Sequence, residues 1–278
     1  MLRIRRFSLL LCAAAALTAC SDGGMAPTES SRPIIGATDA SDPSLQTTIK
    51  RKNDAQIVSA TGDIAAGVAA YRELLGTLNP NLPGEQPGGR REINWDGVPA
   101  ALTNVDNFPG NFFNVNSPRG VLFTTDGTGF RNSDNGFVDV NAAYAGEFNT
   151  FSPPKLFVAV GSTITDIQFV VAGSNTPATV TGFGSVFADV GRARSTTIEY
   201  FDVNGHRLLK VKAPRRSDEK GLSFVGAVFD SRIVARVRIT SGDTPIGAES
   251  FDNVKGGGPK SDIVAMDDFI YGEPRATH

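Results

Sequence analysis

Short runs of β-branched and aromatic residues, separated by turn-forming residues, recur along the second half of the chain. They follow one another at intervals of about ten residues, a spacing typical of the strands of an antiparallel sandwich or jelly roll. The runs that we expect to form strands are 120–125, 156–160, 163–172, 178–190, 195–203, 206–211, 222–229, 233–240 and 263–271. The pattern predicts a mostly β fold: a jelly-roll-like antiparallel β-sandwich over residues 93–274, preceded by one short N-terminal helix.

We expect the segment 53–92 to contain this helix and a loop, both packed on the sandwich. Asp63 is a residue type that begins helices, and Gly76 is one that ends them. Between the two, apolar residues recur at the three- and four-residue spacing of one helix face, namely Ile64, Val68, Tyr71, Leu74 and Leu75. The prolines and glycines of 79–91 indicate an irregular loop. Because the run 263–271 is apolar on both faces, we expect a central strand, with the helix covering one of its faces.

The dipeptide Asn204-Gly205 predicts a β-hairpin between two of the expected strands. Asn-Gly favours a two-residue type I′ turn, in which both central residues have positive φ. Such a turn places Val203 opposite His206 and Asp202 opposite Arg207. We expect the second of these to be a favourable cross-strand charge pair.

Residues 1–20 have the pattern of a lipoprotein signal peptide. A basic start is followed by an apolar run from Phe7 to Leu17, shorter than the ~20 residues that a membrane-spanning helix needs. The run ends in Leu-Thr-Ala-Cys, which has the form of a lipobox. We therefore predict export and attachment of lipid to the Cys20 thiol, with the polar residues 21–52 as a flexible tether. Because Ser21 and not aspartate follows the cysteine, we expect the outer membrane of the cell envelope.

Cysteine usage and charge narrow the expected interactions. Cys12 leaves with the signal peptide and Cys20 carries the lipid, so we expect no disulfide and a fold held by its core alone. The chain has 27 Lys and Arg against 29 Asp and Glu, a formal net charge of −2, and no basic stripe. This argues against nucleic acid as a partner. The expected partners are the membrane, through the lipid on Cys20, and a glycan or other surface component.

Five segments have a combination of motifs that is specific as a set. They are 89–99 (GRREINWDGVP), 112–120 (FFNVNSPRG), 176–184 (TPATVTGFG), 235–242 (ARVRITSG) and 266–274 (MDDFIYGEP). Together they resemble an uncharacterised family of secreted bacterial β-sandwich proteins, several of which carry PEP-CTERM-type sorting tails. The resemblance covers roughly residues 65–274 and implies an exported sandwich. The family has no assigned activity, so it implies no catalytic residues, and the lipobox here implies a different mode of anchoring.

The sequence contains no recognisable catalytic motif. Its two histidines, His206 and His278, form no metal-binding pair, and neither a G-x-S-x-G elbow nor a phosphate-binding loop is present. We therefore predict no catalytic residues. One enzymatic alternative stays open, because two acids ~5–9 Å apart suffice for glycoside hydrolysis. The acids that we consider for such a pair are Asp96, Asp126, Asp134, Asp139, Glu147, Glu199, Asp267 and Asp268.

Asp267 and Asp268 interrupt the otherwise apolar run 263–271. A buried carboxylate without a partner is unfavourable, so at least one of them needs a basic side chain, backbone N–H groups or a metal ion. Calcium prefers oxygen ligands from loops, and Asp96 is a candidate co-ligand. The segment 132–136 resembles half of an EF-hand but lacks the carboxylates that its ends require. Two alternatives remain: a structural calcium held by Asp96, Asp267 and Asp268, or pairing within the protein.

Sugar-binding faces present aromatic side chains, and Trp95, Tyr144 and Tyr200 are the candidates here. Trp95 also fits a core position, two residues after Ile93. The anchor, the tether and the sandwich, without a catalytic motif, favour a non-catalytic binding module for a glycan or another surface component. A polysaccharide-degrading jelly-roll enzyme and a purely structural envelope protein are the alternatives.

Overall fold

The computed structural model describes residues 46–216, 221–254 and 260–277. All of them belong to one compact unit, Ser41–His278. The signal peptide, Cys20 and residues 21–45 of the expected tether lie outside the described residues, so their predicted roles stay predictions.

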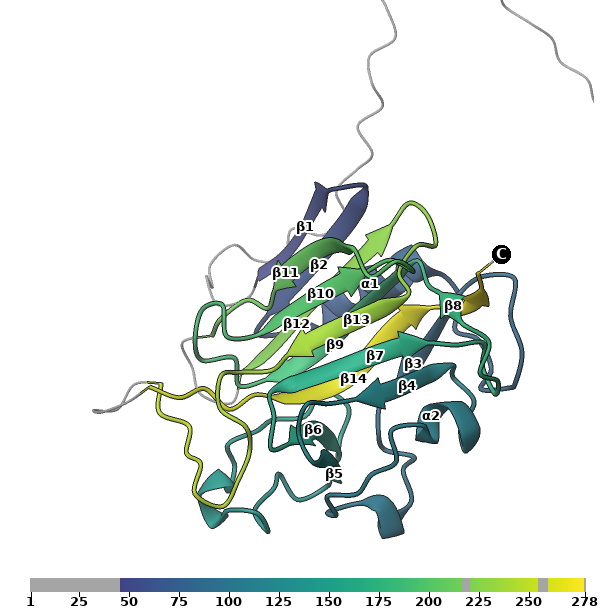
Figure 1. Ribbon diagram of the computed structural model, residues 1–278. Helices are drawn as coiled ribbons and strands as arrows, with labels where there is room; N and C mark the ends of the chain where they lie inside the picture. The colour runs from purple at the N-terminus through teal and green to yellow at the C-terminus, as the bar shows by residue number, and fades with distance from the viewer. Residues whose placement is uncertain (1–45, 217–220, 255–259, 278) are drawn as a thin grey trace, which may run out of the picture. The chain divides into compact units, whose positions relative to one another are not determined.

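The described residues form two large antiparallel sheets and a small one (Figure 1). The larger sheet has the order β1-β2-β12-β9-β14-β6-β5, and β3 also pairs with β14. Its strands are β1 (Gln46–Lys52), β2 (Ala55–Thr61), β3 (Arg90–Ile93), β5 (Gly129–Ser133), β6 (Leu156–Val160), β9 (Gly182–Ala188), β12 (Leu222–Phe229) and β14 (Ala265–Gly272).

The second sheet has the order β11-β10-β13-β7-β4, and β15 pairs with β8 in the small sheet. These strands are β4 (Val121–Thr124), β7 (Ile164–Phe169), β8 (Ala178–Thr179), β10 (Thr197–Phe201), β11 (Arg207–Lys212), β13 (Arg236–Thr240) and β15 (Arg275–Ala276). The helical segments are α1 (Ala65–Leu75), α2 (Phe112–Val115) and the 3-10 turns η1 (Ala100–Leu102) and η2 (Ala142–Tyr144). The two large sheets pack as a sandwich, which confirms the predicted fold class.

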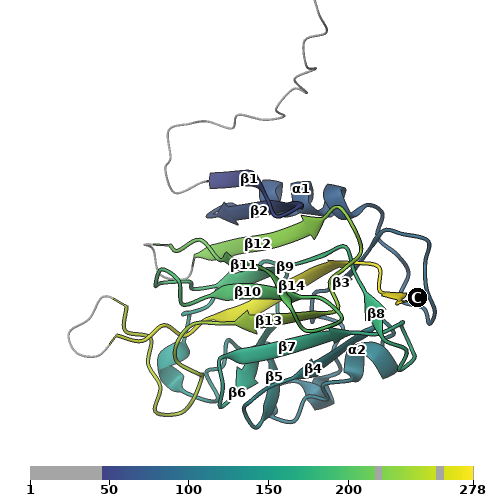
Figure 2. The same cartoon turned by 45° about the horizontal axis from the view of Figure 1, so that its top comes forward.

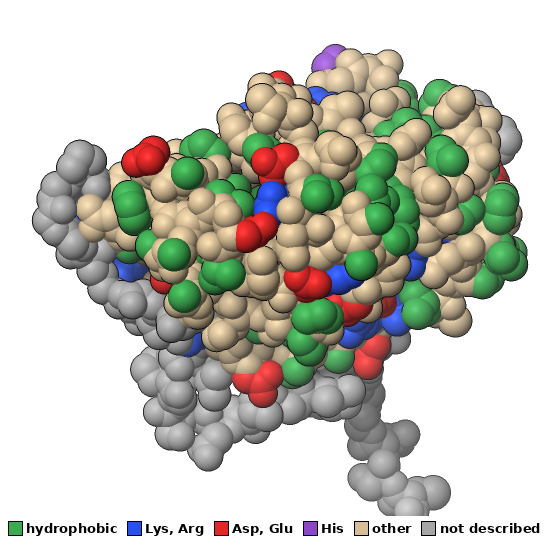
Figure 3. Space-filling model, turned by 90° about the horizontal axis from the view of Figure 1, so that it is seen from below, with side chains coloured by type: hydrophobic (Ala, Val, Ile, Leu, Met, Phe, Trp, Pro, Cys, Tyr) green, Lys and Arg blue, Asp and Glu red, His purple; other side chains and the backbone are tan. Residues whose placement is uncertain are grey.

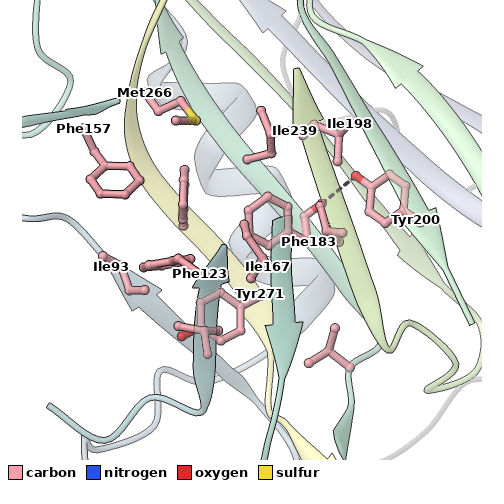
Figure 4. Packing of buried hydrophobic residues seen from close by; sticks show 14 of the residues in the cluster. Ile93, Phe123, Phe157, Ile167, Phe183, Ile198, Tyr200, Ile239, Met266 and Tyr271 are labelled. Carbon is pink, nitrogen blue, oxygen red and sulfur yellow. Dashed lines mark hydrogen bonds between the residues drawn. The ribbon is translucent and has the colours of Figure 1, made fainter. Parts of the chain in front are cut away.

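The main core lies between the sheets and is rich in aromatic rings. Trp95 stacks on Phe157 with ring centroids 3.9 Å apart, and Phe269 meets its edge at 5.1 Å. Farther along the core, the Tyr200 hydroxyl donates a hydrogen bond to the Phe183 carbonyl oxygen at 2.8 Å (Figure 4). The aromatic runs of the sequence therefore form one continuous packed layer.

β14 is the central strand that the apolar run 263–271 predicts, and every residue of it is buried. One of its edges pairs with β9. The other edge is shared, because Met266 pairs with β6 and the residues from Phe269 to Gly272 pair with β3. The strand therefore changes partner in its middle, between Met266 and Phe269.

α1 covers the outer face of the larger sheet, beside β2 and β12 (Figure 2). The Asp63 carboxylate accepts a hydrogen bond from the Ala65 N–H at 3.1 Å, and Gly76 ends the helix with φ of 90°. Tyr71 is fully buried on the sheet and its hydroxyl donates to the Ala227 carbonyl oxygen at 3.2 Å. Below its ring lie Gly184 and Gly226, which face each other across β9 and β12. The absence of side chains at these glycines lets the tyrosine reach the backbone.

We expect Gly226→Ala to lower the free energy of unfolding by about 1–3 kcal/mol, the usual cost of overpacking a tight core. A Cβ at this position would lie 2.7 Å from two ring carbons of Tyr71. Gly88→Ala is the control, because a Cβ there meets no atom within 4 Å. Urea denaturation of both variants measures the difference, and equal stability of the two would contradict this packing.

Several strands lie where the sequence indicated other structure. Residues 46–52, expected in the flexible tether, form β1, and β2 also precedes α1, so the helix does not precede the whole sandwich. β1 is an edge strand that is exposed along nearly its whole length, and its basic residues are of the kind that protect sheet edges. β3 begins inside the expected loop 79–91. Neighbouring strands, and not apolar periodicity, fix these elements.

The predicted hairpin forms, but its turn differs from the expected one. Only Gly205 of the dipeptide has positive φ, 79°, so the turn is not type I′. A register shift between Tyr200 and Phe201 pairs Arg207 with Phe201 and not with Asp202. The Asp202 carboxylate instead accepts hydrogen bonds from backbone N–H groups of the turn, including that of His206 at 2.8 Å. The Asp202 carboxylate therefore stabilises the turn and does not form the expected cross-strand pair with Arg207.

Candidate functional site

Asp267 and Asp268 lie on a β-bulge in the centre of β14. Met266 is opposite Phe187 and Phe269 is opposite Ser185, so the two aspartates together face the single residue Val186. In a regular strand, neighbouring side chains point to opposite faces. The extra residue of a bulge removes this alternation, and both carboxylates here reach the same hydroxyl, that of Ser152.

Both carboxylates of this aspartate pair are buried and fully engaged. Asp267 accepts hydrogen bonds from the Phe151 and Ser152 N–H groups at 2.6 and 3.3 Å. Asp268 accepts one from the Ser152 hydroxyl at 2.6 Å and pairs with the Arg72 guanidinium of α1 at 3.3 Å. Burial, followed by the charge of Asp268, raises the pKa of Asp267 to about 8. The pair therefore holds a proton at neutral pH.

We expect Asp267→Asn to stabilise the protein by about 3 kcal/mol or more at pH 8, with little effect at pH 4. Because the folded-state pKa of Asp267 is raised, its stabilising contribution is complete below the ordinary aspartate pKa. That contribution is lost as the pH rises toward about 8. Asparagine carries no such charge and keeps an oxygen for the two N–H groups.

Urea denaturation from pH 4 to pH 9 tests this prediction. The exposed Asp126→Asn should keep the pH dependence of the unsubstituted chain. An Asp267→Asn curve that runs parallel to the unsubstituted one at every pH would disprove the assignment.

Two aspartates of the predicted calcium set, Asp267 and Asp268, contact protein groups in the described structure. Asp96 does lie nearby: Ser152 hydrogen bonds it, and its carboxylate accepts the Lys155 N–H at 3.3 Å. In the part of the chain that the structure describes, however, the only acidic group whose oxygens converge closely enough for a metal lies elsewhere. Backbone N–H groups, Ser152 and Arg72 occupy the aspartate pair, which is the pairing alternative.

The aromatic residues proposed for sugar stacking are core residues. Tyr200 is fully buried and Tyr144 is 2% exposed, and the Tyr144 hydroxyl donates to a carbonyl oxygen of the loop at Gly247 or Ser250. Trp95 is 1% exposed, has φ of 66°, and its indole N–H donates to the Asp267 carbonyl oxygen at 2.8 Å. This is a correction: none of the three presents a ring face to solvent.

A pocket of about 320 Å³ opens beside Trp95, between the segment after β3 and the segment around α2. Its lining residues are Asn94, Trp95, Gly97, Val98, Pro99, Phe112, Phe113, Asn116, Ser117 and Arg119. Three of them, Trp95, Phe112 and Phe113, are buried aromatic residues. Arg119 is fixed at the wall, because its guanidinium donates to the Glu92 carbonyl oxygen at 2.8 Å and to the Ser117 hydroxyl, and it lies over the Phe113 ring.

This pocket combines buried aromatic residues with amide, hydroxyl and guanidinium groups, the usual composition of small-molecule sites. Sequence reasoning named Trp95 from this group but missed Asn116 and Arg119. Both belong to the motif 112–120, which stood out only as part of the family resemblance.

The remaining acids considered for catalysis are dispersed. Asp139 pairs with Arg131, Glu199 pairs with Arg207 and Lys210, and Asp134 accepts from the Asn104 amide at 2.7 Å. Acidic and basic side chains are likewise interspersed with small apolar patches on the face shown in Figure 3.

The sequence did not indicate that three particular acidic residues lie together. Glu147, Asp189 and Asp252 bring carboxylate oxygens within 4.8 Å of one another. Burial, and then the charge of Asp252, raises the pKa of Asp189 to about 8. Burial likewise raises the pKa of Asp252 to about 6. The three residues come from distant parts of the chain, and no local pattern connects them.

Comparison with known proteins shows little similarity. No family model and no curated protein matches the chain. Among solved structures, the chain is similar to the enzymatically active domain of tailspike protein 4 of bacteriophage CBA120, at 16% identity and a TM-score of 0.17. The match covers 51% of this chain and 21% of that one, and so weak a likeness carries no argument.

The fold and the pocket define the class: an antiparallel β-sandwich with a pocket that aromatic residues partly line. Among the described residues, no helix combines the length and the apolar character needed to cross a membrane.

Proposed function

We propose that this protein is a non-catalytic binding module of the cell envelope, exported by its signal peptide and anchored through lipid on Cys20. In this proposal, the pocket between residues 94–99 and 112–119 takes up a saccharide unit of an envelope or extracellular glycan.

The composition of the pocket carries the proposal. A sugar offers hydroxyl groups that both donate and accept hydrogen bonds, and the Asn94 and Asn116 amides can do the same in return. The Arg119 guanidinium is already held in place by Glu92 and Phe113, so binding requires little further ordering of this side chain. The volume of about 320 Å³ lies at the lower end of ligand pockets, which suits a single sugar unit.

The alternative of a carboxylate-pair hydrolase receives less support from this geometry. None of the ten residues that line the pocket is an acid. The aspartate pair of β14 is at most 2% exposed, so a glycosidic bond could not reach it without rearrangement of Ser152 and α1.

Isothermal titration calorimetry of the full chain with galactose, glucose and N-acetylglucosamine tests the proposal. We expect saturable binding of at least one sugar, weakened about three- to tenfold by Asn116→Ala, the loss of one hydrogen bond. Asn111→Ala is the matched control, an exposed asparagine beside α2 that does not line the pocket. Absence of binding to all three sugars, or equal affinity of the two variants, would overturn the proposal.

A further inference from the structure

The acidic cluster of Glu147, Asp189 and Asp252 lies apart from the pocket and is built from three segments. Glu147 follows η2, Asp189 directly follows β9, and Asp252 belongs to the connection between β13 and β14. Asp189 is 2% exposed, whereas the other two side chains are half-buried. The cluster is therefore buried at Asp189 and partly exposed at Glu147 and Asp252.

Two charged groups near the cluster, among the residues that the structure describes, are already engaged with other partners. Asp262 also lies close, but its carboxylate accepts hydrogen bonds from the Gly191 N–H and the Ser195 hydroxyl. The nearby Arg192 is paired with Asp243. Within the described residues, no ion pair involves Glu147, Asp189 or Asp252.

An unsatisfied atom provides the second observation. The Oδ2 atom of Asp189 is buried and has no hydrogen-bond partner among the described residues. Buried polar atoms almost always have a partner, and an orphan of this kind points to an absent ion or water. The Asp189 carboxylate faces two further acids, so a cation at this position would give the orphan oxygen a partner and offset the repulsion among the three groups.

The spacing matches the size of a calcium ion. Calcium binds oxygen ligands at 2.3–2.6 Å, so two oxygens on the same ion lie at most about 5 Å apart. The three carboxylate oxygens here lie within 4.8 Å of one another. We infer that Glu147, Asp189 and Asp252 form a calcium-binding site that joins the end of β9 to the β13–β14 connection. The ion links three distant segments and so stabilises this end of the larger sheet.

Thermal unfolding of the full chain in 1 mM CaCl2 and in EDTA tests the inference. We expect calcium to raise the melting temperature by about 5 °C or more, because an ion that binds only the folded state stabilises it by mass action. We expect Asp189→Asn to abolish this rise, since it removes one ligand charge from the buried side. Asp134→Asn, an exposed acid in the segment that resembles half of an EF-hand, is the control and should keep the full rise.

Two further measurements keep the test decisive. Asp252 is half-buried, so Asp252→Asn replaces Asp189→Asn if that variant fails to fold. Calorimetry on the folded full chain should give one bound calcium ion per chain. An unchanged melting temperature in calcium, the same rise with MgCl2, or a rise retained in the folded Asp189→Asn or Asp252→Asn variant would overturn the assignment. None of these results depends on sugar binding by the pocket.

Discussion

Replacing Arg91 with leucine should lower the free energy of unfolding by about 3–5 kcal/mol, the cost of leaving one member of a buried ion pair without its partner. Arg91 is fully buried and forms a two-pronged pair with Glu273, with both N–O distances at 2.7 Å. The same guanidinium donates to the carbonyl oxygens of Pro80, Leu82 and Pro118. One side chain thus holds the proline-rich loop against the end of β14.

Urea denaturation followed by circular dichroism measures this effect. Arg90→Leu is the matched control, because Arg90 is its neighbour, is partly exposed, and shares Glu92 with Arg72. We expect a smaller loss for the control, because Glu92 keeps its second partner, Arg72, when Arg90 is replaced. A loss for Arg91→Leu as small as that of Arg90→Leu would show that the buried pair does not organise the loop.

Replacing Cys20 with alanine should abolish lipid attachment completely. In the proposed lipoprotein the lipid is attached through the Cys20 sulfur, and the methyl group of alanine offers no atom for that bond. Incorporation of labelled palmitate, together with fractionation of the cells, measures the effect. Cys12→Ala is the control, since the chain has only two cysteines and Cys12 lies within the expected signal peptide. Label that persists in Cys20→Ala, or disappears in Cys12→Ala, would refute the lipoprotein assignment.

Features with a local pattern were predictable from the sequence. The apolar run 263–271 indicated a central strand, because only a strand covered on both faces lacks polar alternation, and β14 is that strand. The turn residues indicated the β10–β11 hairpin, although not the bulge that redirects Arg207 toward Glu199. Strands with polar sequences, such as β1 and β5, were missed, because their neighbours in the sheet determine them.

The candidate sites depend on contacts that a single sequence does not encode locally. The sequence indicated that Asp267 and Asp268 need partners, because a buried carboxylate without one is unfavourable. Backbone N–H groups and a basic side chain were among the partners considered, and the structure shows both kinds. The bulge that places them on one face could not be foreseen. The meeting of Asp189 with Glu147 and Asp252 arises only when the sandwich closes, so no local pattern in the sequence could indicate this cluster.

Fluorescence of Trp95 during a sugar titration tests most directly whether the pocket binds a ligand. Trp95 is the only tryptophan of the chain and lines the pocket, so its emission reports on the site without any label. We predict a saturable change in emission for the full chain and for Asn111→Ala, with a weaker apparent affinity for Asn116→Ala. An emission spectrum of the folded protein that stays unchanged up to high concentrations of galactose, glucose and N-acetylglucosamine would contradict the account.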